Sequence, residues 1–149
     1  MHIRGATLDD AEGIALLSRQ LGYPATSAEV RRFIAILLQH GDQVIFLAED
    51  EYGTICEWVH VYLARRLFMP AFGELGGIVV DEGRRGMGVG KALLEQAESW
   101  AVERGCKWLW IRSNTQRAGT HLFYEKIGYG ILKSQLVFTK QIVGMEDGK

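Results

Sequence analysis

GIVVDEGRRGMGVGKALL, residues 77–94, is the stretch of sequence that decides the fold. A β-branched run at 78–80 leads into a charged turn, then into alternate glycines at 86, 88 and 90, then into an apolar-periodic segment. This order predicts a strand, a loop and a helix. Glycines allow tight turns and lack the Cβ atoms that would keep a ligand away. The first amides of the helix have no intrahelical partner, so the stretch predicts a site for phosphate oxygens.

Two common phosphate loops do not fit the glycine spacing. A Walker A loop needs G-x-x-x-x-G-K-[ST], but Arg85 stands at the first glycine position and Ala92 follows Lys91. A Rossmann fingerprint needs G-x-G-x-x-G and an acidic residue at the end of the next strand. Here the glycines run G-x-G-x-G, and the next strand ends at Ser113-Asn114. The sequence therefore predicts neither a P-loop NTPase nor a dinucleotide-dependent oxidoreductase.

The pattern [RQ]-x-x-G-x-[GA] does fit, at Arg85, Gly88 and Gly90. It resembles the coenzyme A loop of the GNAT N-acetyltransferase superfamily. Asn114 and the segment THLFYEKIGY, residues 120–129, look like the later motif of the same family. The resemblance covers nearly the whole chain and is most specific in residues 79–94 and 114–129.

Composition bounds the class of protein. With 149 residues the chain is long enough for one domain (residues 1–149) whose core needs no metal or disulfide, and 144–149 reads as a loose tail. A net charge of −1 gives no electrostatic case for nucleic acid or an anionic membrane. No metal-ligand spacing, signal peptide or membrane-length apolar run is visible. The two cysteines read as buried thiols, so we expect a cytoplasmic protein without a metal.

Periodicity and turn signals predict an ordered series of elements. Helices are expected from Thr7 to about Gly22, from Thr26 to about Gln39, after the glycine loop to Arg104, and over Ala118–Ile127; strands are expected over 1–6, 44–48, 55–67, 74–80, 108–112, 129–133 and 136–141. On the long strand, Trp58, His60 and Tyr62 share one face. The pair Gly76-Gly77 predicts a bulge or a close backbone approach.

The resemblance implies the α/β fold of that family. It implies a mixed, mostly antiparallel sheet of six to seven strands flanked by about four helices. The sheet is expected to splay between the strand ending at Val80 and the strand ending at Ser113.

The resemblance also implies that acetyl-CoA is the acetyl donor. The amides of the loop are expected to bind its pyrophosphate; these are Arg85, Gly86, Met87, Gly88, Val89, Gly90 and Lys91. Ile78, Val79 and Val80 are expected to pair with the pantetheine arm as an added strand, with the Val80 amide polarising the thioester carbonyl. Asn114 is expected to bond the pantetheine amides, although a helix cap is the alternative. Arg84 either adds positive charge or is a solvated turn residue.

Tyr124 is the expected general acid, because a phenol beside the coenzyme sulfur can protonate the departing thiolate. The alternative is a half-buried aromatic that packs the helix. Glu74, six residues before Val80, is expected on the same strand face as Val80, either as the base acting through water or as an exposed carboxylate. Glu57 and His60 are weaker candidates for the base.

The acceptor is not encoded in a recognisable motif. The block Ser113-Asn114-x-x-Arg117 is most similar to family members that act on small amines, whose amine attacks directly in a ternary complex. A protein N-terminus, a lysine, or a non-catalytic coenzyme A sensor are the alternatives. Aromatic residues on the acceptor side serve a pocket, a homodimer contact or the core; they are Tyr23, Phe33, Trp58, Phe68 and Phe72.

Overall fold

The computed structural model describes residues 1–20, 22–84, 86, 88–113 and 118–144. The chain divides into two units, Met1–Arg112 and Ser113–Lys149, which are described separately. The first unit holds a five-stranded sheet in the order β1-β2-β3-β4-β5. Its strands are β1 (His2–Gly5), β2 (Gln43–Glu49), β3 (Ile55–Arg66), β4 (Met69–Val80) and β5 (Leu109–Trp110). All neighbours pair antiparallel except β4 and β5, which confirms a mixed, mostly antiparallel α/β sheet.

Four α-helices are described, three in the first unit and one in the second. They are α1 (Ala11–Gln20), α2 (Ser27–Leu38), α3 (Val89–Glu103) and α4 (Ala118–Lys126), with short 3₁₀ turns η1 (Leu8–Asp10) and η2 (Glu82–Arg84). The helix α2 begins after Thr26 as the sequence predicts, and Thr26 and Glu29 form a reciprocal capping box there. The Glu29 amide donates to Thr26 Oγ1 at 3.1 Å, and the Thr26 amide donates to Glu29 Oε1 at 3.3 Å.

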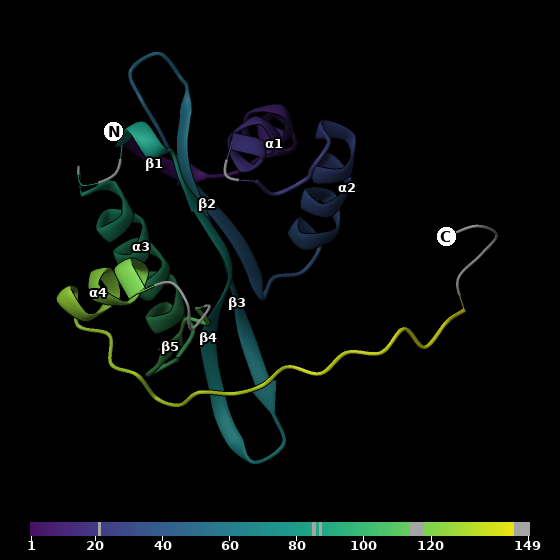
Figure 1. The fold of residues 1–149 in the computed structure, drawn as a ribbon, viewed down its shortest axis with the longest axis vertical. Coiled ribbons are helices and arrows are strands. Elements are labelled where there is room, and N and C mark those ends of the chain that lie inside the picture. The colour runs from purple at the N-terminus through teal and green to yellow at the C-terminus, as the bar shows by residue number, and fades with distance from the viewer. Residues whose placement is uncertain (21, 85, 87, 114–117, 145–149) are drawn as a thin grey trace. The chain divides into compact units, whose positions relative to one another are not determined.

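The helices of the first unit cover opposite faces of the sheet (Figure 1). Trp58 of β3 donates its Nε1–H to Ser18 Oγ of α1 at 3.2 Å, so α1 lies on the Trp58 face. On the other face, a Cβ added to Gly73 would lie 3.1 Å from Ala101 of α3. Because Gly73 pairs with Leu63, the residues of β3 that alternate with Leu63 face α3, and Trp58, His60 and Tyr62 face α1.

A bulge interrupts β4 at Gly76. His60 of β3 lies opposite Gly77 and the next residue, Val61, lies opposite Leu75, which leaves Gly76 as the extra residue. A Cβ at Gly76 would come within 2.1 Å of His60 Nδ1, so no side chain fits there. The sequence prediction of a bulge or a close approach is confirmed, and here both occur at once.

Four strand predictions differ from the structure. The strands expected over 129–133 and 136–141 are wrong, because the described residues after α4, 127–144, form neither helix nor strand. β4 begins at Met69 rather than at Glu74, and β5 is two residues long. Alternation of apolar residues shows that a segment can become a strand, but a strand also needs a partner for its backbone groups. The sheet therefore has five strands rather than six to seven.

Glu57 is a carboxylic acid inside the core. It is 0% exposed on the α3 face of β3, and neither of its oxygens has a hydrogen-bond partner among the described residues. Burial raises the pKa of Glu57 to about 8. The folded protein therefore holds this carboxyl in its neutral form at neutral pH, because a buried charge without a partner is costly.

Glu57 makes the stability of the fold depend on pH. The unfolded chain releases the Glu57 proton near pH 4.5, whereas the folded chain keeps it until about pH 8. Between these values the folded state binds one more proton, so this group lowers the free energy of unfolding by up to about 1.4 kcal/mol for each pH unit gained. We expect Glu57→Gln to flatten this fall in denaturant titrations at pH 5, 6, 7 and 8, whereas the exposed control Glu95→Gln leaves it unchanged. Parallel pH profiles for Glu57→Gln and the unmodified protein would contradict the assignment.

Candidate active site

The glycine loop leads from β4 into the first turn of α3. Gly86 and Gly88 adopt φ values of 82° and 78°, in the left-handed region that favours glycine. The first helical bond runs from the Ala92 amide to the Gly88 carbonyl, at 3.1 Å. The amides of Val89, Gly90 and Lys91 precede that bond, so none of them has a helical carbonyl to bond. Arg85 and Met87, two predicted loop residues, lie outside the described residues.

Two cationic side chains near the loop, Arg84 and Lys91, differ in their surroundings. Arg84 pairs with Asp50 Oδ2 at 2.8 Å, which ties η2 to the turn between β2 and β3. The sequence left two interpretations of Arg84 open. The structure shows it as a turn residue that is held by a carboxylate. Lys91 lies exposed in the first turn of α3, where its charge adds to the positive end of the helix dipole.

Among the described residues, one edge of the C-terminal half of β4 has no strand partner. The Asp81 amide bonds the Cys56 carbonyl beside β3 at 2.8 Å. Since backbone groups alternate along a strand, those of Val79 also point to β3, and those of Ile78 and Val80 point away from it. On that outer side β5 pairs with Gly73 and Glu74 alone. The sheet therefore splays where the family resemblance places the splay, and Ile78 and Val80 present their amides to it.

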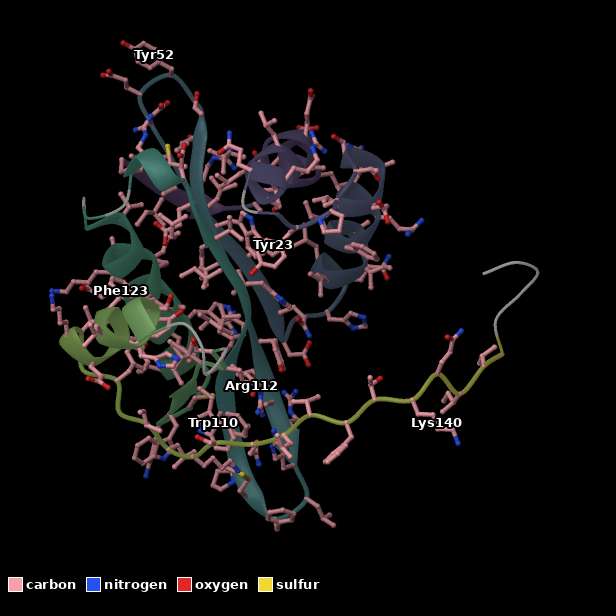
Figure 2. The ribbon with its side chains drawn as sticks, in the orientation of Figure 1. Tyr23, Tyr52, Trp110, Arg112, Phe123 and Lys140 are labelled. Atoms are coloured by element: carbon pink, nitrogen blue, oxygen red, sulfur yellow. The ribbon has the colours of Figure 1, made fainter. Side chains whose placement is uncertain are left out.

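Glu74 is buried and held by two donors. It is 5% exposed, it accepts a hydrogen bond from the Tyr62 hydroxyl, and Arg112 Nε donates to its Oε1 at 3.0 Å. Figure 2 shows Arg112 close to Trp110 of β5, consistent with the 5.9 Å between its guanidinium carbon and the Trp110 ring. Glu74 is therefore not the exposed carboxylate of the alternative interpretation.

Glu74 and Val80 lie on opposite faces of β4, which corrects the expectation that they share one. Glu74 pairs with Tyr62 on the α1 face, whereas Val80 pairs with Glu57 on the α3 face. Six residues of plain alternation would return to the same face, but the extra residue Gly76 shifts the pattern by one.

His60 lies beside Tyr62, the partner of Glu74, on the α1 face. Its ring centroid is 5.6 Å from that of Tyr62, and its Nε2 is 2.6 Å from Gln43 Oε1. Burial lowers the pKa of His60 below its usual 6.5, so the imidazole is neutral at pH 7. In that form Nε2–H donates to Gln43, and Nδ1 faces the backbone at Gly76.

The other predicted catalytic residue belongs to the second unit. Tyr124 is half-buried on α4, with its ring centroid 5.5 Å from that of Phe123 and 6.0 Å from that of Tyr129. Asn114 lies outside the described residues. The structure thus brings the glycine loop, the open edge of β4 and the Glu74 cluster together in the first unit, and it describes Tyr124 separately.

Sequence reasoning missed Tyr62 and Arg112 as partners of Glu74. Tyr62 was placed on the correct face by alternation, but no pattern showed which residue of β4 stands opposite it. Of the predicted acceptor-side aromatics, Phe72 is fully buried in the core, and Phe68 is 86% exposed in the turn between β3 and β4.

Among the described residues, no group of three or more His, Cys, Asp and Glu side chains is arranged to hold a metal ion. None of the described helices has the length and apolarity needed to cross a bilayer.

These features define a mixed α/β fold with a glycine loop at the start of a helix, and comparison with known proteins gives its family. Residues 12–129 match the model of the acetyltransferase (GNAT) family, so the chain belongs to that family and is an acetyl-CoA-dependent N-acetyltransferase. A search of curated protein sequences finds no match.

Solved structures share the fold at low sequence identity. Aminoglycoside 6'-N-acetyltransferase AAC(6')-Ig from Acinetobacter haemolyticus is 20% identical with a TM-score of 0.82, covering 96% of this chain and 100% of its own. A putative acetyltransferase from Agrobacterium tumefaciens is 22% identical with a TM-score of 0.83, covering 94% and 100%. Aminoglycoside N-acetyltransferase AAC(6')-Iy, in complex with CoA, is 17% identical with a TM-score of 0.81, covering 94% and 99%.

The loop geometry predicts that alanine substitutions at Gly88 and Gly105 have similar effects on stability but different effects on coenzyme A binding. Gly88 and Gly105 both have positive φ, of 78° and 84°, and a Cβ at either would meet nothing within 4 Å. Alanine at either position should cost about 1–2 kcal/mol of stability. We expect Gly88→Ala alone to weaken coenzyme A binding in calorimetry, at least tenfold, because it also moves the first amides of α3. Equal coenzyme A affinity in the two variants would show that the loop is a turn without a role in binding.

Proposed function

We propose that this enzyme transfers the acetyl group of acetyl-CoA to a primary amine of a small molecule, by direct attack of the amine in a ternary complex. The observation that carries the proposal is the unpaired edge of β4 at Ile78 and Val80, which continues through the loop into the uncapped start of α3. An edge of this kind fits the amide-bearing pantetheine arm, and the helix start fits the pyrophosphate. The similarity to AAC(6')-Iy, whose structure contains CoA, supports the same reading.

The backbone performs most of the binding in this proposal. The amides of Gly86 and of residues 88–91 hold the pyrophosphate, joined by Arg85 and Met87 from the loop. Ile78 and Val80 pair with the pantetheine arm, and the Val80 amide donates to the thioester carbonyl as negative charge develops on its oxygen. Val79, predicted with them, contributes through its position in the strand, because its own amide points to β3. Asn114 bonds the pantetheine amides.

Two side chains move protons. Glu74 acts as the base and takes a proton through water from the ammonium form of the acceptor, so that the neutral amine can attack the thioester carbonyl. It is held by Tyr62 and Arg112 in one orientation on the α1 face, so little reorganisation is needed. Tyr124 acts as the acid and donates its phenolic proton to the departing thiolate of coenzyme A.

The small-amine acceptor follows from the chemistry of the α1 face. There the buried carboxylate of Glu74 accepts a hydrogen bond from Tyr62, whose ring lies beside the neutral imidazole of His60, and this environment favours a cationic or polar amine. Two similar structures support this class, because one is an aminoglycoside 6'-N-acetyltransferase and another contains the bisubstrate analogue CoA-S-monomethyl-acetylneamine.

An acceptor panel tests the proposed function. With acetyl-CoA fixed, release of free thiol is measured for aminoglycosides, polyamines, amino acids and peptides with free N-termini or lysines. We expect turnover with at least one small polycationic amine, at a kcat/KM ten times or more above that for any peptide. Preference for peptides would replace the small-amine acceptor by a protein one. Coenzyme A binding without transfer to any acceptor would favour a sensor module.

Variants of the two proton-moving residues test the mechanism. We expect Tyr124→Phe to keep coenzyme A affinity and to lower kcat at least tenfold, because the thiolate loses its proton donor. The matched control is Tyr129→Phe, which removes the same hydroxyl from the neighbouring tyrosine and should change kcat less than twofold. We expect Glu74→Gln to lower kcat at least tenfold, because the acceptor loses the group that takes its proton. An unchanged kcat in either variant would remove that residue from the mechanism.

A further inference from the structure

Asp50, in the turn between β2 and β3, accepts three hydrogen bonds. Its Oδ1 accepts from the Tyr52 and Thr54 amides, each at 2.9 Å, and its Oδ2 accepts from Arg84 Nη2 at 2.8 Å. The Thr54 amide and the other two donors lower the pKa of Asp50 below its usual range, so the carboxylate is charged at neutral pH. A solvated ion pair must order both of its side chains, but here two backbone amides already fix the carboxylate that Arg84 binds.

The contact with Arg84 is one of two that join the start of the glycine loop to the hairpin of β2 and β3. The other is a backbone bond, from the Asp81 amide to the Cys56 carbonyl at 2.8 Å. Between the two contacts, the carbonyl of Asp81 accepts from the Arg84 amide at 3.0 Å, and its Oδ1 accepts from the Gly83 amide at 2.9 Å. Arg84 directly precedes the loop pattern in the sequence. The side chain of Asp50 therefore fixes the point at which the loop begins.

The other end of the loop is fixed by the core. Val89, at the start of α3, is 6% exposed, and the Ala92 amide bonds back to the Gly88 carbonyl. Between the two ends, packing does not hold the glycines, because a Cβ added to Gly86 or Gly88 would meet nothing within 4 Å in the described part of the chain. Glycine loses more conformational freedom than any other residue when it is ordered. The arrangement of the loop amides therefore depends on how well both ends of the loop are fixed.

We propose that Asp50 is a positioning residue for coenzyme A: through Arg84 it fixes the start of the glycine loop, so that the loop amides are already arranged when they meet the pyrophosphate. The inference rests on the proposed role of these amides in binding the coenzyme. A preformed loop loses less conformational freedom on binding, so a larger part of the interaction energy appears as affinity. Asp50 lies outside the loop pattern and acts on the coenzyme only through another residue.

The variant Asp50→Asn breaks the contact with Arg84 and keeps the turn. The asparagine oxygen can still accept from the Tyr52 and Thr54 amides, whereas its NH₂ group places donors against the guanidinium. We expect the dissociation constant of coenzyme A in calorimetry to rise about tenfold. With the best acceptor of the panel above, the KM for acetyl-CoA should rise by the same factor, and kcat at saturating acetyl-CoA should stay within twofold of the unmodified protein.

Two comparisons separate this effect from a general loss of stability. The matched control Asp42→Asn breaks the ion pair with Arg65, which spans 3.1 Å at the opposite end of the same hairpin, and should change neither the dissociation constant nor the KM. Arg84→Gln should weaken coenzyme A binding as much as Asp50→Asn does. The double variant should weaken it no further, because both substitutions remove one and the same contact.

The other outcomes overturn the inference. Unchanged affinity in Asp50→Asn would show that the loop keeps its arrangement without the contact, and tighter binding would show that Arg84 binds phosphate while Asp50 competes for it. Additive effects in the double variant, or an equal effect of Asp42→Asn, would show that the contact itself is not responsible. A lower kcat with an unchanged KM would place the effect outside coenzyme binding. Absence of coenzyme A binding to the unmodified protein would overturn the proposed function as well, which distinguishes the two failures.

Discussion

The hydrogen bonding of β4 is the constraint on which the rest of the site depends. Along one edge the strand pairs with β3 from Met69 to Val80, and this ladder fixes the strand in the sheet. Along the other edge β5 pairs with Gly73 and Glu74 alone, so the backbone beyond the bulge keeps its outward groups for a different partner. The loop and α3 follow directly from that stretch, which continues the same row of donors into the helix start. A coenzyme with amides at one end and phosphates at the other matches this row.

The bulge at Gly76 determines which side chains of β4 lie on each face of the sheet. It lets the His60 ring lie against the backbone, and it shifts the alternation so that Glu74 faces α1 while Val80 faces α3. The buried acid of the α1 face is held by Tyr62 and Arg112, whereas the buried acid of the α3 face, Glu57, has no partner among the described residues and stays protonated.

Much of the fold could be predicted from the sequence, because local signals determine it. The Thr26 box, the alternation of Trp58, His60 and Tyr62, and the alternate glycines all act within a few residues of chain. The loop pattern at Arg85, Gly88 and Gly90, together with Asn114 and the segment 120–129, indicates the family, and the family match confirms it. The roles of individual site residues stay predictions, because the coenzyme contacts of Asn114 and Tyr124 depend on parts of the chain described separately or not at all.

What the sequence could not show are the relations between distant segments. The face of the sheet on which Glu74 lies depends on one extra residue, Gly76, in the pairing of β3 with β4. The partners of Glu74, Tyr62 and Arg112, lie 12 and 38 residues away in the sequence. The segments expected as strands after α4 have the composition of strands, but composition does not show whether a segment has a strand partner.

The most direct measurement of the central claim is calorimetric titration of the unmodified protein with acetyl-CoA, coenzyme A, ATP and NADH. The account predicts that both coenzyme A species bind with one site per chain, and that ATP and NADH bind at least a hundredfold more weakly. Binding of ATP as tight as that of coenzyme A would show that the loop recognises phosphates without the edge of β4. Absence of coenzyme A binding would contradict the account altogether.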